Sequence, residues 1–200
     1  DYTMQGARAF DVEFMSGVYE TNFEVVSVEE KDFPAKNSCS LKVGGHLDGC
    51  RIGFDAGGSD RKVSAVIDGK VVYSEEVVWF PKINSDPEYH YSGIYAAMKT
   101  AIEKMGGDVD AIGVSSAGVY IDNKAMVASL FIKVAKDDFE RRIKNIYINV
   151  VKQLETELAA EAKAEEVQLE KLRTESEQRL QEAHDADQRK LAEMEKDLED

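Results

Sequence analysis

The residues with the clearest chemical potential lie in one short run, from Arg51 to Lys62. That run contains Asp55, Gly57, Gly58, Ser59 and Lys62 between two apolar stretches. Glycine can take φ > 0 and has no Cβ, so a glycine turn between strands can present free backbone N–H groups to an anionic oxygen. A carboxylate just before such a turn repels a phosphate unless a divalent cation lies between them. The run therefore predicts a site for a nucleotide phosphate with Mg²⁺.

The elements around the turn have clear signals. Apolar runs predict buried strands over residues 52–56 and 63–67, and Asp68-Gly69 predicts a hairpin turn into a third strand over 71–79. Apolar residues at helical spacing predict a helix over 88–105, which Gly106-Gly107 ends. A further buried strand is predicted over 110–114, and it runs into Ser115-Ser-Ala-Gly118.

The two ends of the chain differ from this middle part. Residues 1–49 form a mixed lead-in segment with a short helix around residues 9–19 and a strand over 23–28. A helix is predicted to begin near Lys136, where acidic residues suit the helix dipole. Residues 154–200 have the composition of a long charged helix or coiled coil. Its apolar seam follows an eleven-residue repeat, with Ser176 and Asp187 at two core positions, which predicts weak homo-oligomerisation.

Charge and cysteine content exclude several classes of partner. The chain has a net charge of −14, and residues 153–200 alone hold 16 acidic against 7 basic residues. Nucleic acids and anionic membranes attract Lys and Arg, so neither is an expected partner. Cys39 and Cys50 are predicted to be free thiols, and no histidine lies at a spacing that would complete a zinc site. No apolar run is long enough to span a membrane, and we expect a cytoplasmic protein.

The order of predicted elements is typical of the opening half of the actin-like ATPase fold. More narrowly, the chain resembles the repressor and sugar-kinase family called ROK. The resemblance runs from about Gly6 to Gln153 and is carried by the sequences at 44–59, 111–118 and 126–131. It implies an α/β fold in which residues 50–153 form a partial ribonuclease H-like, actin-like ATPase subdomain, followed by a long C-terminal helix.

The resemblance also implies roles for individual residues. Asp55 would position Mg²⁺ through water, and the phosphates of ATP or ADP would be bound by Gly57, Gly58, Ser59 and Lys62. The connecting motif beneath the cleft would comprise Ser115, Ser116 and Gly118. The family commonly has a basic or amide residue directly after the turn, whereas this chain has Asp60.

The resemblance further implies a parent activity, the ATP-dependent phosphorylation of a carbohydrate hydroxyl. The family's catalytic Asp lies in an Asn-Asp motif, and neither that motif nor the family's zinc motif follows in these residues. Phosphoryl transfer needs stabilisation from both sides of a cleft. We therefore expect no catalytic residue and no kinase activity in this chain.

Other interpretations remain open from the sequence. The chain could be a non-catalytic interaction protein whose C-terminal helix sets its oligomeric state, or a truncated or fused product without its own function. Gly57-Gly58 could be a plain turn. The three histidines His46, His90 and His184 are expected at the surface or in loops, and Trp79-Phe80 is expected to pack beneath the first helix.

Overall fold

The computed structural model describes the backbone of residues 1–38 and 44–199, with side chains as far as residue 191. It is a mixed α/β structure with a mixed sheet and a long C-terminal helix. The chain divides into two compact units, residues 1–152 and residues 153–200, and each is described by itself. The predicted Cys39 thiol lies outside the described residues.

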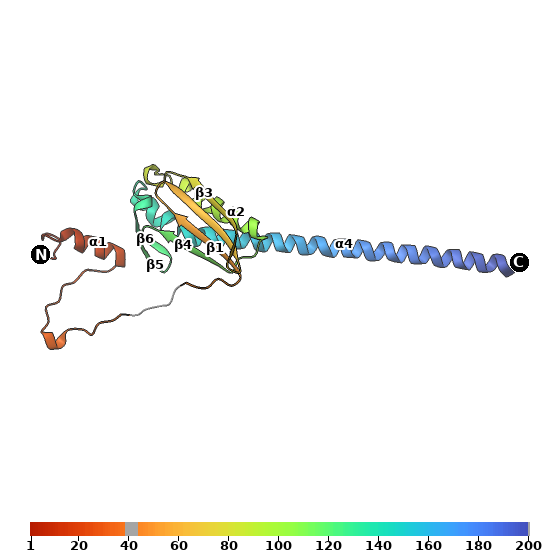
Figure 1. Cartoon of the computed structure of the whole chain (residues 1–200), viewed down its shortest axis with the longest axis horizontal. Helices are drawn as coiled ribbons and strands as arrows, with labels where there is room; N and C mark the ends of the chain where they lie inside the picture. Colours follow the sequence, from red (N-terminus) through yellow and green to blue (C-terminus); the bar gives the residue numbers. More distant parts are fainter. Residues whose placement is uncertain (39–43, 200) are drawn as a thin grey trace. The chain divides into compact units, whose positions relative to one another are not determined.

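The first unit is built on a four-stranded sheet in the order β3-β2-β1-β4 (Figure 1). Its strands are β1 (Cys50–Ala56), β2 (Asp60–Ile67), β3 (Lys70–Val78) and β4 (Ala111–Ser116). The pairs β1/β2 and β2/β3 are antiparallel, whereas β4 lies parallel to β1. A parallel neighbour needs a long crossover connection, and helix α2 (Pro87–Met105) provides it.

Helix α2 begins and ends where the sequence predicts. The Asp86 carboxylate accepts a hydrogen bond from the Glu88 N–H, and Pro87 occupies the first turn, where its missing N–H costs nothing. Gly106 closes the helix with φ +86°, a conformation that glycine adopts without a Cβ penalty. The buried face of α2 includes Ile94, Met98 and Ala101 and contacts the sheet.

The buried apolar side chains of β1 and β2 lie on the face of the sheet that α2 covers. Ile52 and Phe54 on β1 and Val63 and Ala65 on β2 are buried, while their neighbours along each strand are more exposed. Strand alternation places the exposed residues on the opposite face of the sheet. Trp79, which follows β3, is 1% exposed, and its ring packs beneath α2 as predicted. The same prediction is wrong for Phe80, which is 55% exposed.

A second, two-stranded sheet was not predicted from the sequence. It consists of β5 (Gly118–Ile121) and β6 (Lys124–Ala128), joined by a turn in which Asp122 and Asn123 both have positive φ. Helix α1 (Ala9–Tyr19), which the sequence does predict, contacts β6 and buries Val12 and Val18.

Three further predictions are wrong, two about strands and one about the position of a histidine. Residues 23–28 form no strand, and Val25 and Val26 are 64% and 72% exposed. Strand β4 is not buried, because it lies at the edge of the sheet and only Ile112 and Ser116 are partly covered. His90 is neither in a loop nor at the surface, since it lies on α2 and is fully buried.

Helical structure resumes at Lys136, as predicted. A short helix, α3 (Lys136–Asp138), leads into a π-helical turn at Phe139–Ile143 and then into α4 (Ile146–Glu199). Three 3₁₀ turns complete the secondary structure of the described residues, at Glu30–Asp32, Pro81–Ile83 and Ser129–Phe131.

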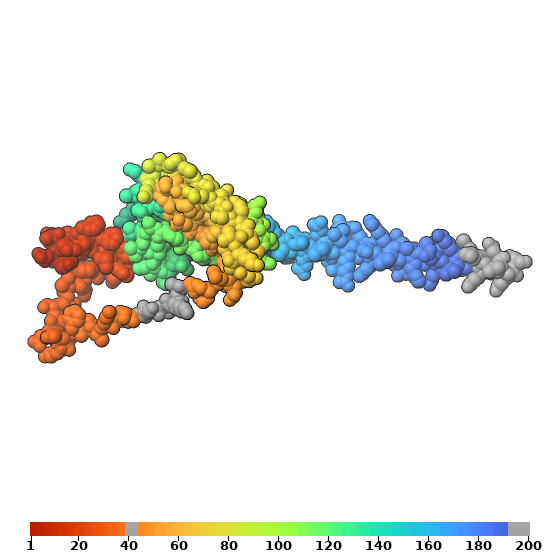
Figure 2. All heavy atoms as spheres, viewed as in Figure 1, coloured from red at the N-terminus to blue at the C-terminus, as the bar shows by residue number. Residues whose placement is uncertain are grey.

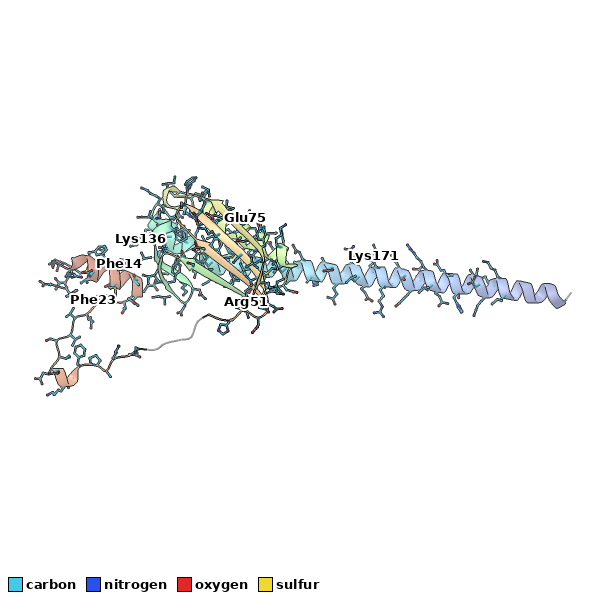
Figure 3. The ribbon with its side chains drawn as sticks, viewed as in Figure 1. Phe14, Phe23, Arg51, Glu75, Lys136 and Lys171 are labelled. Atoms are coloured by element: carbon cyan, nitrogen blue, oxygen red, sulfur yellow. The ribbon has the colours of Figure 1, made fainter. Side chains whose placement is uncertain are left out.

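The second unit consists of the part of α4 from residue 153 onward. Ion pairs between residues four apart stabilise its surface, including Arg173–Glu177 at 3.1 Å and the longer Lys171–Glu175 contact. Lys171 is labelled on the helix in Figure 3. The apolar side chains Leu169, Leu172, Leu180 and Leu191 are all more than half exposed. Among the described residues, no helix is both long enough and apolar enough to cross a lipid bilayer.

Candidate functional site

The glycine turn joins β1 to β2, but its glycines are needed for space rather than for positive φ. Neither Gly57 nor Gly58 has a positive φ. A Cβ on Gly57 would lie 2.5 Å from the carbonyl oxygen of Asp60, and a Cβ on Gly58 would lie 2.8 Å from the Lys82 ammonium nitrogen. The positive φ on which the sequence prediction relied is therefore absent, and both glycines are required by close contacts instead.

Trp79 forms two hydrogen bonds with the glycine turn. The indole Nε1–H donates to the Gly57 carbonyl at 2.7 Å, and the Trp79 backbone N–H donates to the Ser59 carbonyl at 3.1 Å. By contrast, the N–H groups of Gly57, Gly58 and Ser59 donate to no acceptor among the described residues. These carbonyls are therefore satisfied while the three amides remain free for a ligand.

Two of the predicted phosphate ligands already have a partner in Asp60. The Lys62 ammonium lies 2.9 Å from the Asp60 carboxylate, and the Ser59 hydroxyl donates to the same carboxylate at 3.3 Å. The hydrogen bond with Lys62 lowers the pKa of Asp60, and the same bond raises the pKa of Lys62. Asp60 therefore competes directly with any anion that approaches the turn.

Lys82 is a site residue that the sequence analysis missed. It belongs to the 3₁₀ turn Pro81–Ile83, and the end of its side chain lies beside the backbone of Gly58. Within the described part of the chain, no carboxylate forms an ion pair with Lys82. The sequence separation of 24 residues hides this proximity, and only a fold that returns the chain from β3 to the turn reveals it.

Asp55 lies on the open face of the sheet, beside an exposed hollow of about 520 Å³. Its register partners are Lys62 on β2 and Ser115 on β4, and both also line the hollow. The floor is formed by small residues, including Gly53, Ser64, Ser74 and Gly113. Figure 2 shows β2 and β3 (orange to yellow) at the surface of this unit. One carboxylate with a neighbouring hydroxyl suits Mg²⁺, which usually keeps several of its waters.

The structure separates the residues of the predicted connecting motif. Ser115 faces the hollow, but Ser116 lies on the other face of β4, where its hydroxyl contacts Tyr120 at 2.6 Å and Tyr147 at 3.2 Å. Burial raises the pKa of both tyrosines. Gly118 begins β5, where a Cβ would lie 2.3 Å from the Val127 carbonyl oxygen. Ser116 and Gly118 thus have packing roles.

The buried histidine of α2 packs among aromatic rings. His90 packs edge-on against Phe131 and Trp79, and its Nε2 lies 3.3 Å from the Asn84 carbonyl oxygen. Across the residues that the structure describes, no group of three or more His, Cys, Asp or Glu side chains is arranged to hold a metal ion.

No known protein family matches the chain, and no curated protein matches it.

Proposed function

We propose that residues 50–153 form the phosphate-binding subdomain of a ROK-type, sugar-kinase-like protein, and that they bind ATP or ADP with Mg²⁺. The observation that carries the proposal is the glycine turn at the end of β1. Its three amides are free, and the unpaired Lys82 ammonium lies over its centre. Backbone N–H groups and a nearby cation are the groups that bind phosphate oxygens in proteins.

The fold context supports the same assignment. Strand β4 lies parallel to β1, so the carboxyl ends of both strands point the same way. The glycine turn and the end of β4 therefore lie at the same end of the sheet. Ligands of open α/β sheets bind outside the carboxyl ends of parallel strands. Asp55 and Ser115, in register near these ends, offer oxygen ligands for Mg²⁺ waters.

Lys82 removes the main objection that the sequence raises. The acidic residue Asp60 stands where the resemblance implies a basic or amide side chain, and it neutralises Lys62. Lys82 supplies a positive charge to the same turn from a different segment. The proposed role is therefore nucleotide binding, with the sugar site and the catalytic base outside these residues.

Calorimetric titration with Mg²⁺-ADP tests the proposal. We expect weak but measurable binding that Lys82→Ala and Gly58→Ala each reduce about three- to tenfold, because each change removes or displaces the free cation. The double variant should lose no more than the single variants, since both act through Lys82. Lys136→Ala, an exposed lysine on α3, is the matched control and should bind like the wild type.

Several results would contradict the proposal. Identical heats for the wild type and Gly58→Ala, or an equal loss in Lys136→Ala, would show that the turn binds no phosphate. Release of ADP from ATP in the presence of hexoses, above a buffer control, would show that these residues catalyse transfer after all.

The exposed leucines of α4 support a second candidate, a non-catalytic interaction protein in which the helix carries the function. A helix with an exposed apolar stripe normally buries that stripe against a partner. Absence of nucleotide binding together with self-association would favour this candidate over the first.

A further inference from the structure

The two edges of the main sheet have different chemistry. Strand β3 carries Lys70, Glu75 and Glu76, of which Glu75 is labelled in Figure 3. The pairing of β3 with β2 is irregular at Ala65/Val66. Charged side chains and bulges are the features that protect an edge strand from pairing with another chain. Strand β4 has the sequence Ala-Ile-Gly-Val-Ser-Ser, without a charge, a proline or a bulge in its pairing with β1.

The hydrogen bonds of β1 show which backbone N–H and C=O groups of β4 point away from the sheet. Gly49 bonds to Asp68 on the β2 side, and Cys50 bonds to Asp110 on the β4 side. Because bonding direction alternates along a strand, Ile52 and Phe54 bond towards β4. Their register partners Ile112 and Val114 therefore direct their N–H and C=O groups outward. These outward groups have no backbone partner among the described residues.

We propose that β4 is a self-association edge, on which a second copy of this chain places its own β4 antiparallel about a two-fold axis at Gly113. In this register Ile112 bonds to Val114 of the second copy, and the reverse pair repeats the bonds by symmetry. Gly113 of one chain lies opposite Gly113 of the second copy. The two backbones approach most closely at this position, and neither glycine has a side chain.

Charge and space favour this occupant. Asp110 falls opposite Ser116 of the second copy, so no carboxylate faces another carboxylate across the pair. The nearest described atom to a Cβ on Gly113 is the Ile52 carbonyl oxygen at 3.9 Å, so nothing within the sheet crowds the position. The strand also carries no charge and no proline, which are two features of segments that pair with copies of themselves.

Hydrogen exchange and sedimentation of the full chain test this surface. We expect the amides of Ile112 and Val114 to exchange about tenfold more slowly as the protein concentration rises from micromolar to millimolar, because pairing protects them. Association through α4 would leave these amides unchanged, so the readout separates the two modes. Exchange that is fast at every concentration would overturn the proposal.

Two substitutions on β4 have matched controls on β3. Val114→Pro removes an outward N–H without breaking the ladder, and we expect it to abolish the concentration-dependent protection at Ile112. Val78→Pro makes the same change at the other edge of the sheet and should leave that protection intact. Val114→Lys and Val78→Lys repeat the comparison without a proline, in case the proline variants fold poorly.

The alternative occupants give distinct results. Protection of Ile112 and Val114 that is equally strong at all concentrations would show that another segment of the same chain covers β4. Equal effects of the substitutions on β4 and β3 would show that the association does not use this edge. Either result would overturn the proposal.

Discussion

At the scale of single residues, Asp60 controls the charge of the glycine turn. Its carboxylate binds both Lys62 and Ser59, two of the predicted phosphate ligands. Asp60→Asn removes the competing charge while keeping the size of the side chain. We expect the variant to bind Mg²⁺-ADP about three- to tenfold more tightly than the wild type, a modest gain because the pair is partly exposed.

Glu76→Gln is the control for this prediction. Glu76 lies 3.8 Å from Lys62 but outside the turn, so its neutralisation changes the net charge equally without releasing Ser59. If both variants bind the nucleotide equally, net charge rather than the turn explains the gain. Calorimetric titration of the two variants under the same conditions distinguishes the explanations.

Buried His90 makes stability depend on pH. Burial lowers its pKa in the folded protein, with Nδ1 buried and unbonded. The unfolded chain, where histidine has its ordinary pKa of about 6.5, therefore binds a proton that the folded protein resists. The free energy of unfolding should fall as pH drops below that value, by at most about 1.4 kcal/mol per pH unit.

Denaturant unfolding between pH 7.5 and pH 5 measures this dependence. His90→Phe should flatten the profile on the acid side even if it lowers stability overall. His46→Gln, at an exposed position in the lead-in segment, should keep the wild-type slope. A wild-type slope in His90→Phe would assign the acid sensitivity to other groups.

At the scale of elements, the sequence predicts those with strong local signals. The 88–105 helix has apolar periodicity and a glycine stop, and the hairpin at Asp68-Gly69 has the required turn residues, with φ of 47° and 77°. Residues 23–28 have the alternation of a strand but no partner strand. The β5–β6 hairpin is too short for periodicity to reveal it.

The candidate site also combines residues that are adjacent in sequence with residues that only the fold brings together. Asp55 and the glycine turn are contiguous in sequence, so the sequence alone can propose them as a candidate site, whereas Lys82 reaches the turn only through the tertiary path of the chain. The surroundings of Ser116 also depend on elements far away in sequence, since Tyr147 belongs to α4. A sequence pattern could not show that adjacent serines would have different roles.

The Ser116–Tyr120–Tyr147 cluster joins β4, β5 and α4 within the first unit. Burial raises the pKa of Tyr147, so the folded protein keeps the phenol proton that the unfolded chain loses above about pH 10. Stability is therefore expected to fall as pH rises through the unfolded-state pKa, because the unfolded state then binds fewer protons. Tyr147→Phe should weaken this alkaline loss and cost about 1 kcal/mol at neutral pH through the lost hydrogen bond.

Thermal unfolding at pH 7 and pH 10.5 measures both effects. Tyr19→Phe, in which the altered ring is 56% exposed, is the matched control and should retain the alkaline loss. An unchanged loss in Tyr147→Phe would show that other groups control alkaline stability.

At the scale of the whole molecule, the charge of α4 opposes its apolar seam. Residues 153–200 have a net charge of −9, while the seam residues Leu169 and Leu172 are exposed. Repulsion acts over about 10 Å at 0.1 M salt and about 3 Å at 1 M. We therefore expect weak helix-mediated self-association that salt strengthens.

Sedimentation across a salt series in the Val114→Pro background isolates this association from pairing at β4. Leu169→Gln should weaken it, whereas Val167→Gln should not, because Val167 has similar exposure but lies on the opposite side of the helix from the seam. A tight dimer at low salt would show that the seam outweighs the charge. A monomer at all salt concentrations would show that the helix is solvated on every face.

The parallel pairing of β1 with β4 also has a consequence for how the chain folds. The β1/β2 and β2/β3 pairs join neighbours in sequence, whereas Ile52 and Ile112, which are in register, are separated by the whole of β2, β3 and α2. Closing so long a loop costs conformational entropy before the contacts compensate for it. We therefore expect the β1–β3 meander to form early and the docking of β4 to complete the sheet. Until it docks, the side of β1 that pairs with β4 is an open strand edge, which exposes the chain to misassembly during synthesis.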